Sequence, residues 1–202
     1  DTDKKSHMIT TEKVFKVLSA IGIPGSILIF VLSGPLIEWL YAGKFNESIP
    51  ILMIVSWFFA FECISFSLGD VLTTTNRQWQ RTVVQGSALI LLFALIMVLD
   101  HFFGIIGAAY ALIIVEAYIF LSYYILVRKG VYQIHIWRQL PLVLIASLIM
   151  AAAAWLSKDW NPLLSAAMAG AVYGGILIAF DKDFRRIGKY VWNLISVRRK
   201  KL

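Results

Sequence analysis

Two glutamates interrupt long apolar stretches of this chain and are its first candidates for chemistry. Glu62 lies within the apolar run 48–76, and Glu116 lies within the apolar run 102–127. An acidic side chain inside hydrocarbon is costly, so it indicates a functional role and a partner. No Lys or Arg lies inside any apolar run of the chain. Each carboxyl must therefore be protonated, face water, accept hydrogen bonds from neighbours or meet a cation from outside these runs.

Glu62 and Glu116 allow two interpretations. In the first, they border a water-filled cavity and bind a coupling proton, a sodium ion or a substrate. In the second, each is a hydrogen-bonded acid that supports a contact between helices. The sequence alone does not decide between the two.

A second group of polar residues follows in the same stretch of chain. Asp70 precedes Arg77 by about two helical turns, so a continuous helix would place them near one face and favour an interfacial ion pair. Alternatively, Arg77, Arg81 and Gln85 form the cytoplasmic mouth of a site and contact an anionic headgroup there. Asp70 belongs to the same mouth.

The other reactive residue types indicate no further chemistry. The chain has one cysteine, which can form neither an intrachain disulfide nor a thiolate metal cluster, and its three histidines are far apart. No nucleophile elbow, phosphate-binding glycine loop or zinc-binding motif is present. We therefore expect no catalytic residue, no metal, no cofactor and no enzymatic activity.

Six apolar runs must position these residues. The chain is 59% hydrophobic and 15% charged, with a mean hydropathy of +0.76, which is too little polar material to cover a water-soluble domain. Each run can cross a bilayer as a helix, because about 20 residues cover ~30 Å of hydrocarbon. The runs bounded by charges are 17–37, 48–76, 82–99, 102–127, 139–157 and 160–180.

The basic residues orient these six runs. All but two of the 19 Lys and Arg residues fall on one side if the runs alternate across the bilayer, and the two exceptions are Lys44 and Lys158. Cytoplasmic loops carry the excess of Lys and Arg in membrane proteins. The sequence therefore predicts an all-α integral membrane protein with six transmembrane helices and both ends cytoplasmic. This distribution also explains the net charge of +7 without a nucleic-acid partner.

The chain divides into four regions on this basis. Residues 1–16 form a cytoplasmic juxtamembrane segment, 17–130 form four transmembrane helices, and 131–180 form two more. In 181–202, apolar residues recur at helical spacing among Arg and Lys, which predicts an amphipathic helix on the cytoplasmic leaflet. Because the chain begins with Asp1 and no signal region precedes it, we expect it to be part of a longer protein.

Three segments in this order resemble bacterial polysaccharide transporters. Residues 34–45, GPLIEWLYAGKF, are similar to the end of one helix of that family, and 69–77, GDVLTTTNR, to a segment that enters a short basic loop. The segment 103–116, FGIIGAAYALIIVE, resembles a helix opening of the form FGxxGAAxAxxΦxE. The chain thereby resembles the C-terminal part of a polysaccharide flippase of the multidrug/oligosaccharidyl-lipid/polysaccharide exporter superfamily.

The resemblance implies a fold and a function. Such proteins contain two helix bundles related by a pseudo-twofold axis, usually followed by two further helices. Residues 17–130 would then complete the second bundle and 131–180 would be the additional pair, while an N-terminal bundle of the same polypeptide is missing. The implied activity is movement of undecaprenyl-pyrophosphate-linked oligosaccharide across the bacterial inner membrane by alternating access, for O-antigen, lipopolysaccharide or other surface polysaccharide biosynthesis. Implied partners are this substrate, membrane lipids and other polysaccharide-assembly proteins.

Other functions fit the same residues. A multidrug or lipid II exporter of the same superfamily differs only in its substrate. A membrane enzyme or a scaffold acting on lipid-linked sugar is a further alternative, although an enzyme would need acidic or histidine clusters in an interfacial loop. The short loops of this chain hold no such cluster.

Overall fold

The computed structural model describes residues 2–131, 140–181 and 183–186, with side chains from Met8 onward, and every element in this part of the chain is a helix. The helices are α1 (Thr2–Tyr41), the short 3-10 helix η1 (Asn46–Ser48), α2 (Ile49–Thr74), α3 (Gln78–Phe103), α4 (Ile105–Gly130), α5 (Leu140–Leu156) and α6 (Pro162–Phe180). The all-α prediction is confirmed. The predicted segment 1–16 continues α1 over its described residues.

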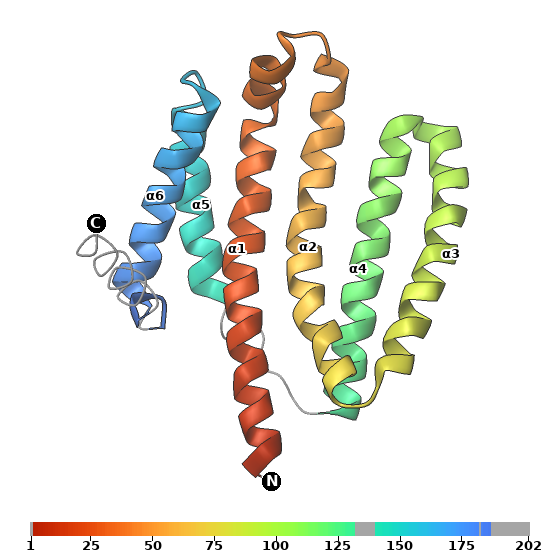
Figure 1. Ribbon diagram of the computed structural model, residues 1–202. Coiled ribbons are helices and arrows are strands. Elements are labelled where there is room, and N and C mark those ends of the chain that lie inside the picture. The colour runs from red at the N-terminus through yellow and green to blue at the C-terminus, as the bar shows by residue number, and fades with distance from the viewer. Residues whose placement is uncertain (1, 132–139, 182, 187–202) are drawn as a thin grey trace, which may run out of the picture.

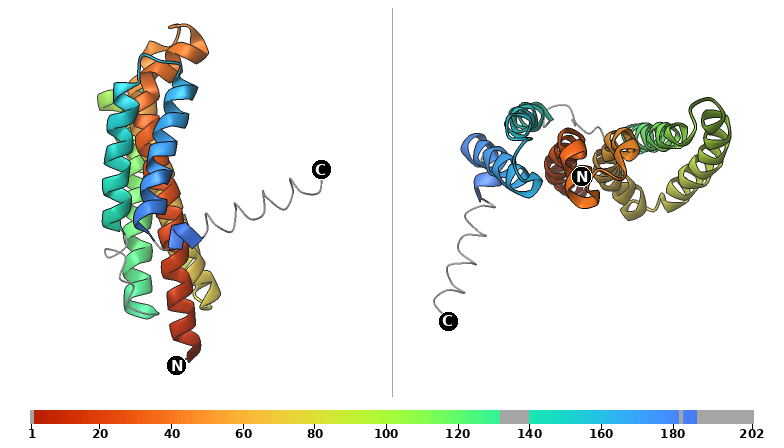
Figure 2. Two further views of the ribbon diagram at one scale, coloured as in Figure 1. Left: turned by 90° about the vertical axis from the view of Figure 1, so that its left-hand side faces the viewer. Right: turned by 90° about the horizontal axis from the view of Figure 1, so that it is seen from above.

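The helices pack side by side in a bent row rather than around a closed core. Neighbours in space follow the order α6, α5, α1, α2, α4 and α3, as Figure 1 and the view from above in Figure 2 show. The long helix α1 lies near the centre of the row and is uninterrupted through Pro24 and Pro35. This arrangement leaves much of the surface of each helix without a protein neighbour.

Two apolar clusters hold the row together. The first joins α5 and α6 to α1 and includes Val143, Met150 and Leu177. The second joins α2, α3 and α4 and includes Leu68 and Val127. Because α1 and α2 contribute side chains to both clusters, the central pair connects the two halves.

Hydrogen bonds between helices add to this packing. The Tyr173 hydroxyl on α6 donates to the Ala20 carbonyl on α1 at 2.8 Å, and the hydroxyls of Ser87 on α3 and Tyr118 on α4 lie 2.8 Å apart. In a lipid environment such bonds carry much of helix association, since hydrocarbon removes the hydrophobic drive between helices.

The turn between α3 and α4 depends on glycine. Gly104 has a φ of 59°, a conformation that other residues rarely adopt. A Cβ atom on Gly107 would overlap the backbone of Leu99, so only glycine permits this approach of α4 to α3. The segment 103–116 singled out in the sequence thus makes a tight helical hairpin.

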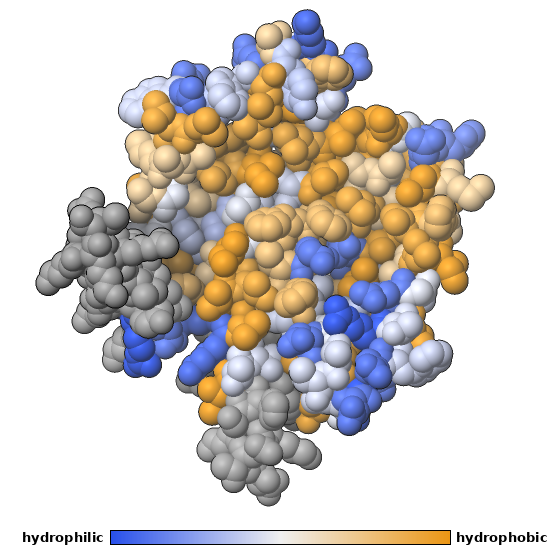
Figure 3. Space-filling view, in the orientation of Figure 1, coloured by the Kyte–Doolittle hydropathy of each residue, from blue (hydrophilic) through white to orange (hydrophobic). Residues whose placement is uncertain are grey.

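Five helices in the described part of the chain are long and apolar enough to cross a membrane. They span Met8–Tyr41, Asn46–Thr74, Gln78–Phe103, Ile105–Gly130 and Pro162–Phe180. The sixth expected span, α5, has 17 described residues, which is ~25 Å of helix. Figure 3 shows apolar side chains across the middle of one face, with hydrophilic residues gathered toward the two ends. These features indicate a membrane protein.

The predicted amphipathic tail falls mostly outside the described residues. Of 181–202, the structure describes Asp181 and a helical turn at 183–186. The rest of that prediction stays untested.

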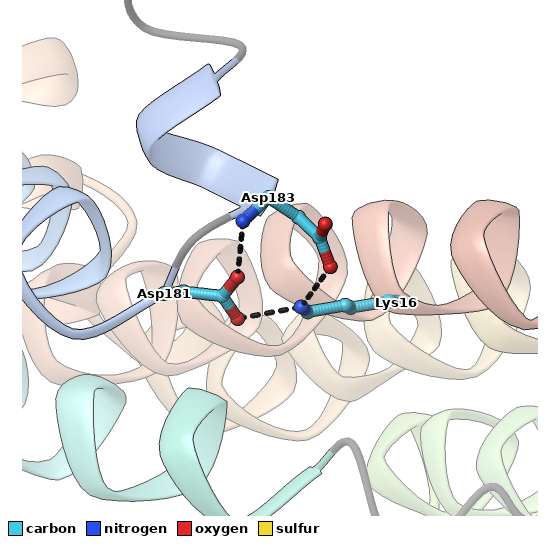
Figure 4. Close-up of polar contacts among 3 residues, drawn as sticks. All are labelled: Lys16, Asp181 and Asp183. Atoms are coloured by element: carbon cyan, nitrogen blue, oxygen red, sulfur yellow. Dashed lines mark hydrogen bonds and ion pairs between the residues drawn. The ribbon is translucent and has the colours of Figure 1, made fainter.

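A small ionic cluster ties the end of α6 to the first half of α1. The Lys16 ammonium nitrogen lies 2.6 Å from an Asp181 carboxylate oxygen and 2.9 Å from one of Asp183 (Figure 4). The backbone N–H of Asp183 also donates to the Asp181 carboxylate at 2.9 Å. Its hydrogen bond with Lys16 holds the pKa of the Asp183 carboxyl below the usual value. The cluster places the N-terminal part of α1 and the C-terminal end of α6 on the same side of the molecule, along the direction of the helix axes.

Replacement of Lys16 should therefore loosen α6 from α1. We expect Lys16→Met to lower the stability of the chain in detergent by about 1–3 kcal/mol, because it leaves the poorly exposed Asp181 carboxylate without a cation. The measurement is the thermal unfolding midpoint. Lys13→Met, an exposed lysine on the same helix, is the matched control and should have little effect.

The same cluster predicts a pH dependence. Because the pKa of Asp183 is lowered, its share of the difference between wild type and Lys16→Met is full above pH ~4 and disappears as the pH falls through the lowered value. Equal unfolding midpoints for wild type and Lys16→Met at neutral pH would contradict a stabilising role for the cluster.

Candidate functional site

The candidate site follows the contact between α2 and α4. These two helices run in the same direction side by side, and the start of α3 lies against both at one end. We call this contact, with its polar residues, the α2–α4 seam. Its polar members and the glycine between them are Glu62, Ser65, Gly69, Thr73, Arg81, Glu116 and Tyr123.

The structure brings the two acidic candidates together. Glu116 on α4 is 7% exposed, and one of its carboxyl oxygens is buried with no hydrogen-bond partner. Glu62 is exposed on α2 and is near enough to interact electrostatically with Glu116. Neither carboxyl forms a hydrogen bond or an ion pair with any residue in the described part of the chain. Of the two interpretations, the hydrogen-bonded acid in a helix contact is therefore not observed.

Two further buried oxygens without partners lie on the same two helices. They are the hydroxyl oxygens of Ser65, about one turn after Glu62 on α2, and of Tyr123, two turns after Glu116 on α4. Most buried polar atoms in proteins have a hydrogen-bond partner. Glu116 and Ser65 lack one at this seam, as Ser19 and Ser26 do on α1, whereas the Tyr123 hydroxyl interacts with the Arg81 guanidinium. A seam that accepts a proton, water or a small cation would provide Glu116 and Ser65 with a partner.

Arg81 closes the seam at its basic end. Its guanidinium donates a hydrogen bond to the Thr73 hydroxyl at 3.0 Å and interacts electrostatically with Tyr123. A Cβ atom on Gly69 would lie 3.1 Å from the Tyr123 ring and 3.3 Å from Arg81 Nε. The glycine therefore permits the close approach of Arg81 on α3 and Tyr123 on α4 to the backbone of α2.

Arg77 occupies a different position from the one predicted for it. Helix α2 ends at Thr74, and the chain reverses at Asn76, where φ is 58°. Arg77 therefore leaves the face of Asp70, and the predicted ion pair between them is absent from the structure. Its guanidinium instead lies against Gly130, where a Cβ atom would overlap it. A cation is favourable there, because the C-terminal end of a helix carries partial negative charge.

Asp70 and Gln85 are both exposed, and neither side chain makes a described contact with the seam. Of the four residues predicted at the cytoplasmic mouth, the structure joins Arg81 to the seam and places Arg77 at the end of α4. Among the described residues, no group of three His, Cys, Asp or Glu side chains could hold a metal ion.

Sequence reasoning missed Tyr123, Ser65 and Thr73 as members of the seam. The spacing could have indicated two of them, since Tyr123 follows Glu116 by two turns and Ser65 follows Glu62 by one. Thr73 gave no such signal, because its role depends on where the α2–α3 turn directs Arg81. The ionic cluster of Lys16 with Asp181 was also missed, although both residues were recognised as flanks of apolar runs.

Comparison with known proteins adds no relative. No family model, curated protein or solved structure matches this chain. The function must therefore be argued from the residues and their geometry.

The close approach at Gly69 can be tested directly. We expect Gly69→Val to lower stability in detergent by about 1–3 kcal/mol, because the added methyl groups would press against Tyr123 and Arg81. The measurement is again the thermal unfolding midpoint. Gly86→Val on α3 is the matched control, because a Cβ atom at Gly86 meets nothing within 4 Å. Equal midpoints for the two variants would show that the seam is not tightly packed at Gly69.

Proposed function

We propose that this chain is part of a membrane transporter that flips an undecaprenyl-pyrophosphate-linked oligosaccharide across the bacterial inner membrane by alternating access. The observation that carries the proposal is the pair Glu62 on α2 and Glu116 on α4, one exposed and one buried without a hydrogen-bond partner, on two helices that pack against each other. Acidic residues at membrane depth mark ion and substrate pathways. The sequence resemblance described above supplies the class of substrate.

A lipid-linked oligosaccharide makes contradictory demands on its carrier. Its polyprenyl tail is compatible with hydrocarbon, whereas its pyrophosphate and sugars are not. A carrier must therefore offer polar groups at membrane depth and remain open to lipid at the side. The polar seam between otherwise apolar helices and the open row of helices suit that demand.

The surface of the row supports a larger assembly. Large apolar side chains are exposed along most helices, among them Ile90, Met97, Leu148 and Leu164. In the proposed transporter some of these contact lipid and others contact the helices of a second bundle. Rocking of one bundle against another would then expose the seam alternately to the two sides.

We also propose that all six helices cross the membrane and that both ends are cytoplasmic. The distribution of Lys and Arg supports this orientation. The contact of Lys16 with Asp181 agrees with it, because an even number of crossings returns the chain to the side on which it started.

Cysteine accessibility tests the six crossings. In a Cys63→Ser background, a membrane-impermeant maleimide added to intact cells should label Lys44→Cys and Lys158→Cys. It should label Gln78→Cys and Lys129→Cys only after permeabilisation. Because Lys129 and Lys158 flank α5, labelling of both from the same side would show that α5 does not cross.

Glu116→Gln tests the transport function. In cells whose surface polysaccharide depends on this protein, we expect the variant to reduce export about tenfold, equivalent to ~1.4 kcal/mol on the limiting step, because the amide keeps the shape but cannot ionise. Lipid-linked oligosaccharide should accumulate in the cytoplasmic leaflet at the same time. Both quantities are measured at matched expression.

Glu47→Gln is the control for that experiment, because Glu47 is exposed on η1 away from the seam. Wild-type export by Glu116→Gln would remove Glu116 from the site. Loss of export without accumulation of the lipid-linked sugar would contradict the flipping step itself.

A further inference from the structure

An open cavity of about 740 Å³ lies at the opposite ends of the helices from the Lys16 cluster. It is formed where α1 ends, where η1 leads into α2, and at the loop between α5 and α6, in the upper part of Figure 1. Its size falls within the range of small-molecule sites. None of the seam residues lines it.

Two tryptophans from distant parts of the sequence line this cavity. Trp39 belongs to the last turns of α1 and is 49% exposed, and Trp160 belongs to the α5–α6 loop and is 61% exposed. Indole rings offer broad apolar faces with a polar N–H, so they pack well against ligands that are apolar on one face and polar at the rim. The C–H faces of a pyranose ring have this character.

Hydrogen-bond acceptors and a hydrogen-bond donor line the cavity beside the tryptophans. Glu38 and Asp159 provide carboxylates, and Asn46 provides an amide that both donates and accepts. Among the described residues, neither Glu38 nor Asp159 forms an ion pair or a side-chain hydrogen bond. Sugar hydroxyls, which donate and accept at once, match such groups.

The cavity has room for a ligand because α1 presents a glycine to it. Gly34 and Pro35 lie on its α1 wall, and a Cβ atom on Gly34 would meet nothing within 4 Å. The absence of a side chain at Gly34 thus widens the cavity.

An aromatic belt at the membrane surface is the ordinary alternative for exposed tryptophans. Trp79 on α3 fits that alternative, because it is 74% exposed and does not line the cavity. Trp155 does not line the cavity either, but its ring contacts Lys158, which does. Trp39 and Trp160 differ from both, since they line one cavity together with carboxylate and amide groups. The chain therefore contains exposed tryptophans both inside and outside the cavity, and the two groups can be compared by mutation.

We propose that this cavity binds a short hexose-type oligosaccharide, with pyranose faces on Trp39 and Trp160 and hydroxyls on Glu38 and Asp159. In the orientation proposed above, the cavity opens on the outer side of the membrane. There it contacts the sugar portion of the substrate after flipping, and this biological assignment rests on the proposed function. Sugar binding itself is a separate property of the chain.

Saturation-transfer NMR on the purified chain tests the binding. The chain is placed in lipid nanodiscs, free of sugar-headed detergent, and titrated separately with maltotetraose and with N,N′,N″-triacetylchitotriose. We expect transfer of saturation to the ring protons of at least one of these probes. Trp39→Ala and Trp160→Ala should each weaken that binding about tenfold, whereas Trp79→Ala should bind as wild type does.

Gly34→Phe provides a variant that keeps all the proposed binding groups. The phenyl ring would occupy open space in the cavity, so it should block the sugar while leaving the unfolding midpoint close to that of wild type. Binding by Gly34→Phe at wild-type affinity would place the sugar elsewhere and overturn the proposal. Absence of saturation transfer to both probes, or equal loss in Trp39→Ala and Trp79→Ala, would overturn it too.

Glu116→Gln separates this proposal from the transport function. Because Glu116 lies outside the cavity, the variant should bind the sugar probes as wild type does. Sugar binding by the chain together with loss of export by Glu116→Gln without accumulation of the lipid-linked sugar would contradict only the transport function. Impaired export by Glu116→Gln with no sugar binding would contradict only the cavity proposal.

Discussion

Hydrocarbon offers no hydrogen-bond partner to a peptide group, and this constraint governs the architecture of the chain. A segment surrounded by lipid must satisfy its backbone internally, which an α-helix does. The helices described here expose apolar side chains on the surfaces that do not contact one another, as surfaces in lipid require. Helix packing then relies on close backbone approach and on a few bonds between helices. Gly107 against Leu99 is an example of the first, and Tyr173 with Ala20 is an example of the second.

The same constraint makes each polar group at membrane depth informative. Several serines in the helices bond to a carbonyl of their own preceding turn, as Ser67 and Ser147 do, and so add little polarity to their surroundings. Ser65, Glu116 and Tyr123 have no such partner. Their placement on the two helices of the α2–α4 seam supports our proposal that a proton, a cation or a polar headgroup passes there.

The two ends of the molecule along the helix axes differ in their chemistry. One end has Lys16 paired with two aspartates, Arg77 at the end of α4, and Arg81 at the end of the seam. The other end has few basic residues and an open cavity lined by tryptophans, carboxylates, amides and one lysine, Lys158. A substrate with an anionic pyrophosphate and neutral sugars would find complementary groups at both ends. The polar seam would then bridge only part of the distance between them.

Composition and charge spacing by themselves determined the helical class and five apolar helices long enough to cross a membrane, because apolar length and flanking charge are local properties of the chain. They also singled out Glu62 and Glu116, since an acid within an apolar run is visible without knowing its neighbours. Only the tertiary structure decided that the two helices carrying these glutamates, α2 and α4, pack against each other, because the order of helices in the row does not follow their order in the sequence.

Contacts between distant segments were beyond the sequence for the same reason. The Asp70–Arg77 prediction was wrong because it assumed that α2 continues, whereas a left-handed residue at Asn76 redirects the chain. The cavity of Trp39 and Trp160 joins residues from opposite halves of the chain. Local pattern fixes what a helix is and how long it is, but which faces meet depends on packing, and packing places together residues that no spacing rule connects.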